Sequence, residues 1–180
     1  LTALDLSSFD TSNVTDMSYM FYIYDGSSAL KTLDLSSFNT GNVTSMEYMF
    51  YNCSSLTSLD VKNFDVSNVT NMSTMFQVCK STTFMFSGCK ALTSLDVSSF
   101  DTSKVTDMSY MFYRCSSLKT ICCTSNTDWS SSSADSRSMF VDCTSLVGGN
   151  GTAYWSSITN KTYARVDGLN GNPGYFTAKQ

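Results

Sequence analysis

The stretch CSSLTSLDVKNFDVSNVTNMSTMF, residues 53–76, contains one complete copy of a pattern that recurs along the chain. A Leu-x-x-Leu-Asp segment is followed by an apolar residue, then by Asn-Phe or Ser-Phe, a polar turn and Met-x-x-Met-Phe. The spacing between copies is about 26 to 29 residues, although the step from Leu56 to Leu92 is longer. A period of this length is typical of stacked repeat architectures, so the chain is a tandem repeat.

The spacing of apolar residues within one copy predicts its local structure. Asp60 lies between Leu59 and Val61, and this alternation indicates a strand with its apolar side chains on one face. The Val-Thr-x-Met-x-x-Met-Phe segment predicts a second inward-facing extended edge, and the Asp and Asn residues between the two indicate a turn. We therefore expect Leu, Val, Met and Phe to form buried columns between stacked copies. A partial copy is expected at Ser81 to Cys89.

Composition and charge exclude several classes of function. The 180 residues contain no histidine, carry a net charge of −4 and are only 14% charged. Without histidine there is no Ser-His or Cys-His nucleophile pair and no histidine-ligated zinc. The acidic balance disfavours nucleic acid as a partner, and no apolar run is long enough for a membrane span. We expect a non-enzymatic protein with no cofactor and no metal site.

Three segments of the chain resemble a known family. Residues 53–76 and the segment CKALTSLDVSSFDTSKVTDMSYMFYRC, residues 89–115, are similar to BspA-like leucine-rich repeat surface proteins of bacteria. The tail LVGGNGTAYWSSITNKTYARVDGLNGNPGYFTAKQ also resembles the segment that ends such repeat regions. The resemblance implies a cell-surface or secreted location, and many members of that family are thought to act as adhesins.

Repeat spacing and resemblance together give the expected architecture. We expect a leucine-rich-repeat-type right-handed β solenoid of five to six coils over residues 1–147, with a small C-terminal β cap over residues 148–180. In the cap, we expect Tyr154, Trp155, Tyr175 and Phe176 to lie over the last coil. Leu1 opens within the repeat pattern, so we expect a fragment whose N-terminal end is uncapped and which is monomeric in isolation.

The cysteines share one position of the repeat. It is occupied by Cys53, Cys79, Cys89, Cys115 and Cys143. We expect a buried column of thiols that fill a turn; disulfides between neighbouring copies and, least favoured, a metal site are the alternatives. Cys122 and Cys123 are adjacent, so at most one of them faces the core.

Two acidic columns are expected on the surface. The first contains Asp5, Asp34, Asp60 and Asp96, and the second contains Asp10, Asn39, Asp65 and Asp101. Stacked carboxylates repel one another, so a cation or a basic partner would stabilise the first column. Hydrogen bonding to Ser and Thr hydroxyls, or solvation, is the alternative that we favour. For the second column we expect Asx turns.

Aromatic columns are the best candidates for ligand binding. Tyr19, Tyr48 and Tyr110 share the position before Met-Phe, together with Thr74 and Phe84. Tyr22, Tyr51 and Tyr113 share the position after it, together with Gln77 and Ser87. If the rings point outward they form an adaptable contact surface among Ser, Thr and Asn. The alternative is that they cover neighbouring copies and lock the stack.

These observations lead to one favoured function and two alternatives. The favoured function is a bacterial surface or secreted module that binds a host or microbial protein or glycan through the tyrosine and first aspartate columns. The alternatives are a structural spacer that projects another domain, and a carbohydrate-binding module that uses the tyrosines or Trp129.

Overall fold

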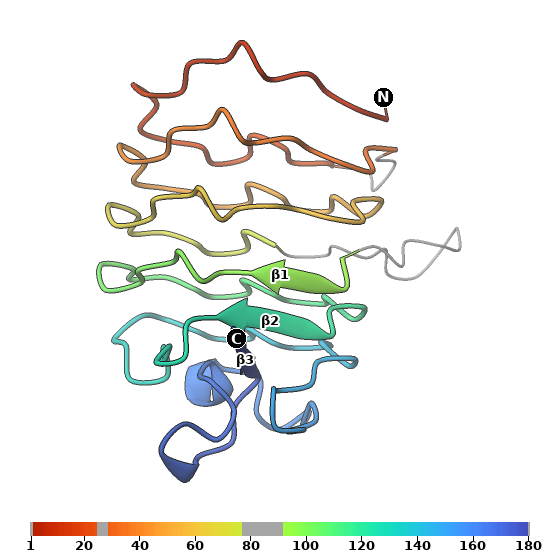
Figure 1. Ribbon diagram of the computed structural model, residues 1–180, viewed down its shortest axis with the longest axis vertical. Helices are drawn as coiled ribbons and strands as arrows, with labels where there is room; N and C mark the ends of the chain where they lie inside the picture. The colour runs from red at the N-terminus through yellow and green to blue at the C-terminus, as the bar shows by residue number, and fades with distance from the viewer. Residues whose placement is uncertain (1, 25–28, 77–91, 180) are drawn as a thin grey trace.

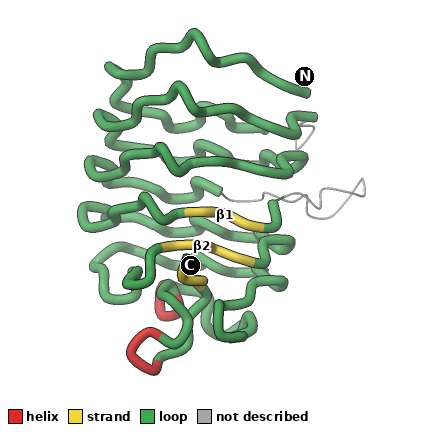
Figure 2. Tube along the Cα trace, in the orientation of Figure 1, coloured by secondary structure: helices red, strands yellow, loops and turns green. Residues whose placement is uncertain are grey.

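The computed structural model describes residues 2–24, 29–76 and 92–179. Figure 1 shows that successive copies of the repeat lie as layers, one beside the next, from the N-terminal to the C-terminal end of the molecule. Most of the described chain is turn and loop, as the green trace of Figure 2 shows. The repeat pattern of the sequence therefore appears as a succession of similar layers.

Regular strands occur in one small sheet. It contains β1 (Ser94–Asp96), β2 (Thr120–Cys123) and β3 (Phe176–Ala178), in that order. All three strands run parallel, with Leu95 beside Ile121 and Ile121 beside Phe176. The last strand comes from the C-terminal segment, so this sheet joins two consecutive repeats to the end of the chain.

The prediction of a right-handed β solenoid of five to six coils is wrong. The described residues contain a single open sheet of three parallel strands and almost no helix, with the 3-10 turns η1 (Lys161–Tyr163) and η2 (Leu169–Gly171) as the helical elements. Elsewhere, neighbouring layers are joined by isolated bridges and turn hydrogen bonds rather than by continuous strands. One series of parallel bridges runs through Asp16, Ser45, Asn71, Asp107 and Asp135.

The Leu-x-x-Leu-Asp segments are too short to form strands in most layers. A turn begins directly after the aspartate, because the Ser7 N–H donates to Asp5 Oδ1 and the Phe9 N–H donates to the Leu6 carbonyl. Thr57 then makes a backbone hydrogen bond to the Lys31 carbonyl of the previous layer, at 3.0 Å, without a continuing ladder. Local side-chain hydrogen bonds have competed here with the strand that the alternation predicted.

The expected second extended edge is also wrong, because the Met-x-x-Met-Phe segment is a series of tight turns. The Met49 N–H donates to the Met46 carbonyl and the Tyr51 N–H donates to the Tyr48 carbonyl. Tyr48 itself is left-handed, with φ of 56°. The same position is left-handed in every described layer: Tyr19, Tyr48, Thr74, Tyr110 and Ser138.

The core is formed by side chains that occupy the same position in successive layers. The rings of Phe50, Phe76 and Phe112 stack with centroid separations of 5.6 and 5.7 Å. Phe21 continues this column at one end and Phe140 at the other. The first methionine of each described Met-x-x-Met-Phe segment is buried, and so are the second methionines except Met20. The expected burial of Leu, Val, Met and Phe columns is therefore confirmed for most described layers.

The C-terminal segment packs against the last ring of the phenylalanine column. Tyr175 and Phe176 are fully buried and lie edge-on to Phe140, whereas Trp155 is exposed. The expectation that Trp155 covers the last layer is therefore wrong. The Asp167 carboxylate fastens this segment, because it accepts hydrogen bonds from the backbone N–H groups of Asn150, Thr152 and Gly174.

The expected partial repeat at Ser81 to Cys89 lies outside the described residues. So do the predicted column members Cys79 and Cys89 and the aromatic-column positions Gln77, Phe84 and Ser87.

Candidate binding surface

A turn brings two tyrosines of each repeat to the same side of a layer. The Tyr22 N–H donates to the Tyr19 carbonyl at 3.1 Å, and the two ring centroids are 5.5 Å apart. Tyr48 and Tyr51 are joined by the same turn, with ring centroids also 5.5 Å apart. The left-handed backbone of the first tyrosine in each pair makes this turn possible.

Backbone hydrogen bonds between layers set the two tyrosine pairs in register. The Tyr19 N–H donates to the Glu47 carbonyl at 2.9 Å. As a result Tyr19 stacks on Tyr48 with centroids 4.9 Å apart, and Tyr22 stacks on Tyr51 at 4.8 Å. Tyr22 also meets Tyr48 edge-on at 6.2 Å. These four rings form one group, which we call the tyrosine cluster: Tyr19, Tyr22, Tyr48 and Tyr51.

The tyrosine cluster is partly open to solvent. Tyr19 is 52% exposed and the other three rings are half-buried. Burial raises the pKa of Tyr51, and its neighbours Tyr22 and Tyr48 raise it further. The rings therefore cover neighbouring copies of the repeat, as one expectation had it, and they also leave a surface open to solvent, as the other had it.

The column of tyrosines is interrupted after the second layer. Thr74 occupies the next tyrosine position and is buried. Beyond it, Tyr110 and Tyr113 form a second pair with ring centroids 5.6 Å apart, and the guanidinium of Arg114 lies 5.1 Å from the centre of the Tyr113 ring. Arg114 also forms an ion pair with Asp142, with Nε and Oδ2 3.5 Å apart. The predicted tyrosines therefore form two groups rather than one stripe.

The first aspartate column is held by local hydrogen bonds. In each member, Oδ1 accepts the backbone N–H two residues later: Ser7 to Asp5, Ser36 to Asp34, Lys62 to Asp60 and Ser98 to Asp96. The side-chain and backbone hydrogen bonds from Ser7 lower the pKa of Asp5. The backbone hydrogen bond from Ser36, with that from its side chain, lowers the pKa of Asp34. This supports the interpretation in which hydrogen bonds, rather than a bound cation, stabilise the column.

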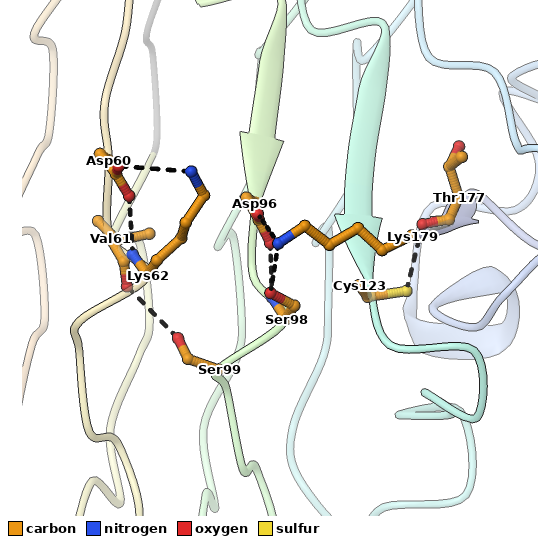
Figure 3. A network of polar contacts seen from close by, with 9 residues as sticks. All are labelled: Asp60, Val61, Lys62, Asp96, Ser98, Ser99, Cys123, Thr177 and Lys179. Atoms are coloured by element: carbon orange, nitrogen blue, oxygen red, sulfur yellow. Dashed lines mark hydrogen bonds and ion pairs between the residues drawn. The ribbon is translucent and has the colours of Figure 1, made fainter.

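Lysine side chains accompany the last two members of the column, as Figure 3 shows. Lys62 Nζ lies 3.4 Å from Asp60 Oδ2, and Lys179 Nζ lies 2.8 Å from Asp96 Oδ2. Burial raises the pKa of Asp96, but the hydrogen bonds from Lys179 and Ser98 outweigh it and the net shift is downward. Asp60, Lys62 and Asp96 border a hollow of about 410 Å³, which Leu59 and Cys122 also line. Asp5 and Asp34 have no ion pair among the described residues.

The structure contains a third Asx column, which the sequence analysis missed. Asp16, Asn71, Asp107 and Asp135 each accept the backbone N–H two residues later. The second column, Asp10, Asn39, Asp65 and Asp101, does the same, so its predicted Asx turns are confirmed. The sequence signal for this third column is an Asp or Asn that lies two residues before a Ser or Arg in the Met-x-x-Met-Phe segment. We expected an extended segment there instead of a turn.

The described cysteines are free thiols, and most are buried. Cys53, Cys115 and Cys143 each direct Sγ to the carbonyl of a phenylalanine in the preceding layer, at 3.2, 3.1 and 2.9 Å. Burial raises the pKa of Cys53 to about 12. The expected column of buried thiols is confirmed for these three, and the disulfide alternative is wrong for them. As expected, Cys123 is buried, whereas Cys122 is partly exposed.

Trp129 does not form an open platform for a sugar ring. It is 4% exposed and lies edge-on to Phe176, with centroids 4.9 Å apart. One side of it borders a hollow of about 350 Å³, together with Asp101, Asp128 and a run of serines. The ring therefore serves mainly as part of the core.

Neither a metal-binding cluster nor a membrane-spanning helix is present in residues 2–24, 29–76 and 92–179. Within these ranges no group of three or more Cys, Asp or Glu side chains is arranged to hold a metal ion. In the same part of the chain no helix has the length and apolar character needed to cross a membrane.

Comparison with known families gives one match. The model of the family described as "Mycoplasma protein of unknown function, DUF285" matches residues 2–84 and 79–155. The chain belongs to this family. The two matches meet near the irregular step of the repeat, which is consistent with two runs of the same pattern. A search of curated proteins and a search of solved structures each gave no match.

Proposed function

We propose that this DUF285 protein is a non-enzymatic binding module of a bacterial surface or secreted protein, of the BspA-like type. The observation that carries the proposal is the tyrosine cluster, in which four rings from two repeats lie together and remain partly open to solvent. Tyrosine provides a large amphipathic contact area and loses little conformational entropy on binding. Stacking reduces that cost further, because each ring is already held by its neighbours.

We favour a protein partner over a sugar. A sugar ring that stacks on tyrosine needs an open ring face, and the faces between Tyr19 and Tyr48 and between Tyr22 and Tyr51 are covered, which leaves the outer faces of Tyr19 and Tyr22 without a stacked ring among the described residues. What the cluster offers instead is ring edges and hydroxyl groups beside Glu47 and Asn71, whose side chains are hydrogen-bonded to each other at 3.2 Å. Mixed aromatic and polar surfaces of this kind are typical of protein interfaces.

The test is a binding screen against extracellular-matrix proteins, host and bacterial cells, and glycans. It compares the wild type with a variant in which the four cluster tyrosines are changed to serine. The matched control is Tyr24→Ser, because Tyr24 is exposed and makes no ring contact with the cluster among the described residues. We expect saturable binding to a protein partner that the cluster variant loses and the control keeps.

Two results would contradict the proposal. One is the absence of any saturable binding, which would favour a structural spacer. The other is binding that the cluster variant retains in full, which would place the interaction elsewhere on the molecule. Binding to glycans alone would favour the carbohydrate-binding alternative.

A further inference from the structure

The hollow beside Trp129 lies between two successive layers of the molecule. One wall comes from residues 100–105, and the other from residues 127–133 of the next layer. The volume of about 350 Å³ is at the small end of the range of about 300–1,000 Å³ for pockets that bind small molecules. No residue of the tyrosine cluster lines this hollow, which we call the serine hollow.

The serine hollow coincides with a change in the repeat. The first wall has the usual Ser-Phe-Asp-Thr-Ser sequence, at residues 99–103. In the next layer, residues 124–133 read TSNTDWSSSS and do not repeat it. The two walls therefore differ in sequence where earlier layers carry the same pattern.

The threonine of the usual pattern fastens neighbouring layers elsewhere in the molecule. Thr11 Oγ1 donates to the Asn39 carbonyl at 3.0 Å, and Thr40 Oγ1 donates to the Asp65 carbonyl at 2.8 Å. Thr102 occupies the same position and lines the serine hollow, but its hydroxyl makes no hydrogen bond with any described residue. A hydroxyl that is paired in two other layers is thus available to a ligand here.

Two carboxylates with an available oxygen also line the serine hollow. In Asp101 and Asp128, Oδ1 accepts the backbone N–H two residues later, from Ser103 and Ser130, at 2.9 Å each. Oδ2 of each aspartate accepts no hydrogen bond from any described residue. Because carboxylate oxygens are strong acceptors, these two positions suit a ligand that carries hydroxyl donors.

The rest of the lining is both apolar and polar. Phe100, Val105 and Trp129 are each less than 10% exposed and form an apolar part of the wall. Ser132 Oγ is buried and has no hydrogen-bond partner among the described residues, and rotation about one bond turns it toward a ligand. A ligand that fits this lining has C–H groups as well as hydroxyls.

Two lysines balance the two carboxylates of the serine hollow. Lys104 lies three residues after Asp101 in the same turn. Lys161 Nζ donates to the carbonyls of Ser132 and Ala134 at 2.6 Å each, which also holds the serine wall in place. The local charge is therefore close to zero, and this favours a neutral ligand over a cation or an anion.

We propose that the serine hollow binds one neutral sugar unit of a glycan. The sugar hydroxyls donate to Oδ2 of Asp101 and of Asp128 and accept from the Thr102 hydroxyl. The C–H groups of the sugar contact the apolar wall beside Trp129. This site goes beyond the proposed function, because it is separate from the tyrosine cluster and takes a different class of ligand.

The probes are the methyl glycosides of glucose, galactose and mannose, with glucosamine as a cationic comparison. Saturation-transfer difference NMR detects binding to the whole chain, and titration gives the affinity. Thr102→Val and Asp101→Asn test the hollow. The fold should tolerate both, because Val66 and Asn39 occupy the same positions in other layers.

Two control variants accompany these substitutions. Asp10→Asn makes the same change at the same repeat position in a layer that does not line the serine hollow. The variant with serine at the four cluster tyrosines tests whether a sugar binds there instead. Thermal unfolding establishes that each variant is folded.

We expect at least one methyl glycoside to bind with a dissociation constant of about 10 mM or lower. Thr102→Val and Asp101→Asn should each weaken it by about fivefold or more, while both controls leave it unchanged. The proposal is overturned if no glycoside binds up to about 50 mM, or if both hollow variants keep full affinity. It is also overturned if only glucosamine binds, because the ligand would then be a cation.

Failure here is distinguishable from failure of the proposed function. Loss of sugar binding in the tyrosine variant alone would place the sugar on the tyrosine cluster and overturn the assignment to the serine hollow. Absence of sugar binding, with the protein partner still bound through the cluster, would remove this proposal and leave the proposed function in place.

Discussion

At the scale of single residues, the Asp167 carboxylate accepts four hydrogen bonds from described residues. Oδ2 accepts the N–H groups of Asn150 and Thr152 at 2.9 Å each, and Oδ1 accepts the Gly174 N–H at 3.2 Å and the Thr152 hydroxyl. The side chain is buried, so these donors have no water to replace it. The neighbouring Gly148 leaves no room for a larger residue, since a Cβ there would lie 2.7 Å from Asp167 Oδ2.

We predict that Asp167→Asn lowers the free energy of unfolding by about 2–4 kcal/mol, because an amide NH₂ would face backbone donors. Urea denaturation followed by circular dichroism measures the change. The control is Asp10→Asn, which should change little, because Asn39 already makes the same Asx turn in the next layer. Equal destabilisation by the two substitutions would contradict the role assigned to Asp167.

Thiol reactivity gives a second prediction at this scale. Cys53, Cys115 and Cys143 are buried with Sγ directed to a carbonyl, whereas Cys122 is partly exposed on β2. Because the thiolate is the reactive form and needs access to reagent, iodoacetamide should modify Cys122 well before these three. Mass spectrometry of digested peptides measures the order, with denatured protein as the control. Early modification of Cys53 would contradict the packing described.

At the scale of elements, the same residue type at the same repeat position has different energetic weight in different layers. Phe64 is 1% exposed, whereas Phe9 is 55% exposed. We predict that Phe64→Ala lowers the free energy of unfolding by about 3–5 kcal/mol, whereas Phe9→Ala costs about 0.5 kcal/mol or less. Urea denaturation of the two variants tests this. Similar losses would mean that Phe9 is buried in solution.

The sequence predicted the buried positions better than the local backbone. Period and residue type were enough to place Phe64, Met72 and Leu59 in the core, because a repeat can bury them only against its neighbours. The backbone of the Met-x-x-Met-Phe segment was mispredicted as extended, because its β-branched start favours a strand. The turn at Tyr48 depends on hydrogen bonds to another layer, which one copy of the repeat does not reveal.

The candidate site was predicted in the same partial way. All six tyrosines were identified from their shared positions, but their pairing was not, because it follows from the left-handed Tyr19 and Tyr48. The aspartate columns were identified as well, and their Asx turns follow directly from Asp and Ser two residues apart. The lysine partner of Asp96 could not be predicted, because Lys179 is distant in sequence.

At the scale of the whole molecule, hydrogen bonds favour the ionised form of aspartates in many layers. Hydrogen bonds lower the pKa of many aspartates that form Asx turns, including Asp5, Asp10, Asp34, Asp65 and Asp101. For Asp167, burial raises the pKa, but its four hydrogen bonds outweigh this and the net shift is downward. A carboxyl group whose pKa is lower in the folded state stabilises the fold above its unfolded pKa.

We therefore predict that the free energy of unfolding is highest near neutral pH and falls as the pH drops below about 4, the unfolded pKa of aspartate, toward the lower pKa values of the folded state. Urea denaturation between neutral and acidic pH measures this profile. The Asp167→Asn variant should show a shallower decline, because it has lost one of the groups that titrate. Stability that rises on acidification would contradict the assignment.

The division of the chain at residues 147 and 148 stays a prediction, which limited proteolysis can test.

The central claim is that the tyrosine cluster is the binding surface, and one comparison of affinities tests it most directly. The partner found in the screen is titrated against the wild type, a Tyr48→Ser, Tyr51→Ser variant and a Tyr48→Phe, Tyr51→Phe variant. Because ring packing supplies the contact area, we predict a loss of about tenfold or more with serine and most of the affinity kept with phenylalanine. Wild-type affinity in the serine variant, with its fold intact, would contradict the account.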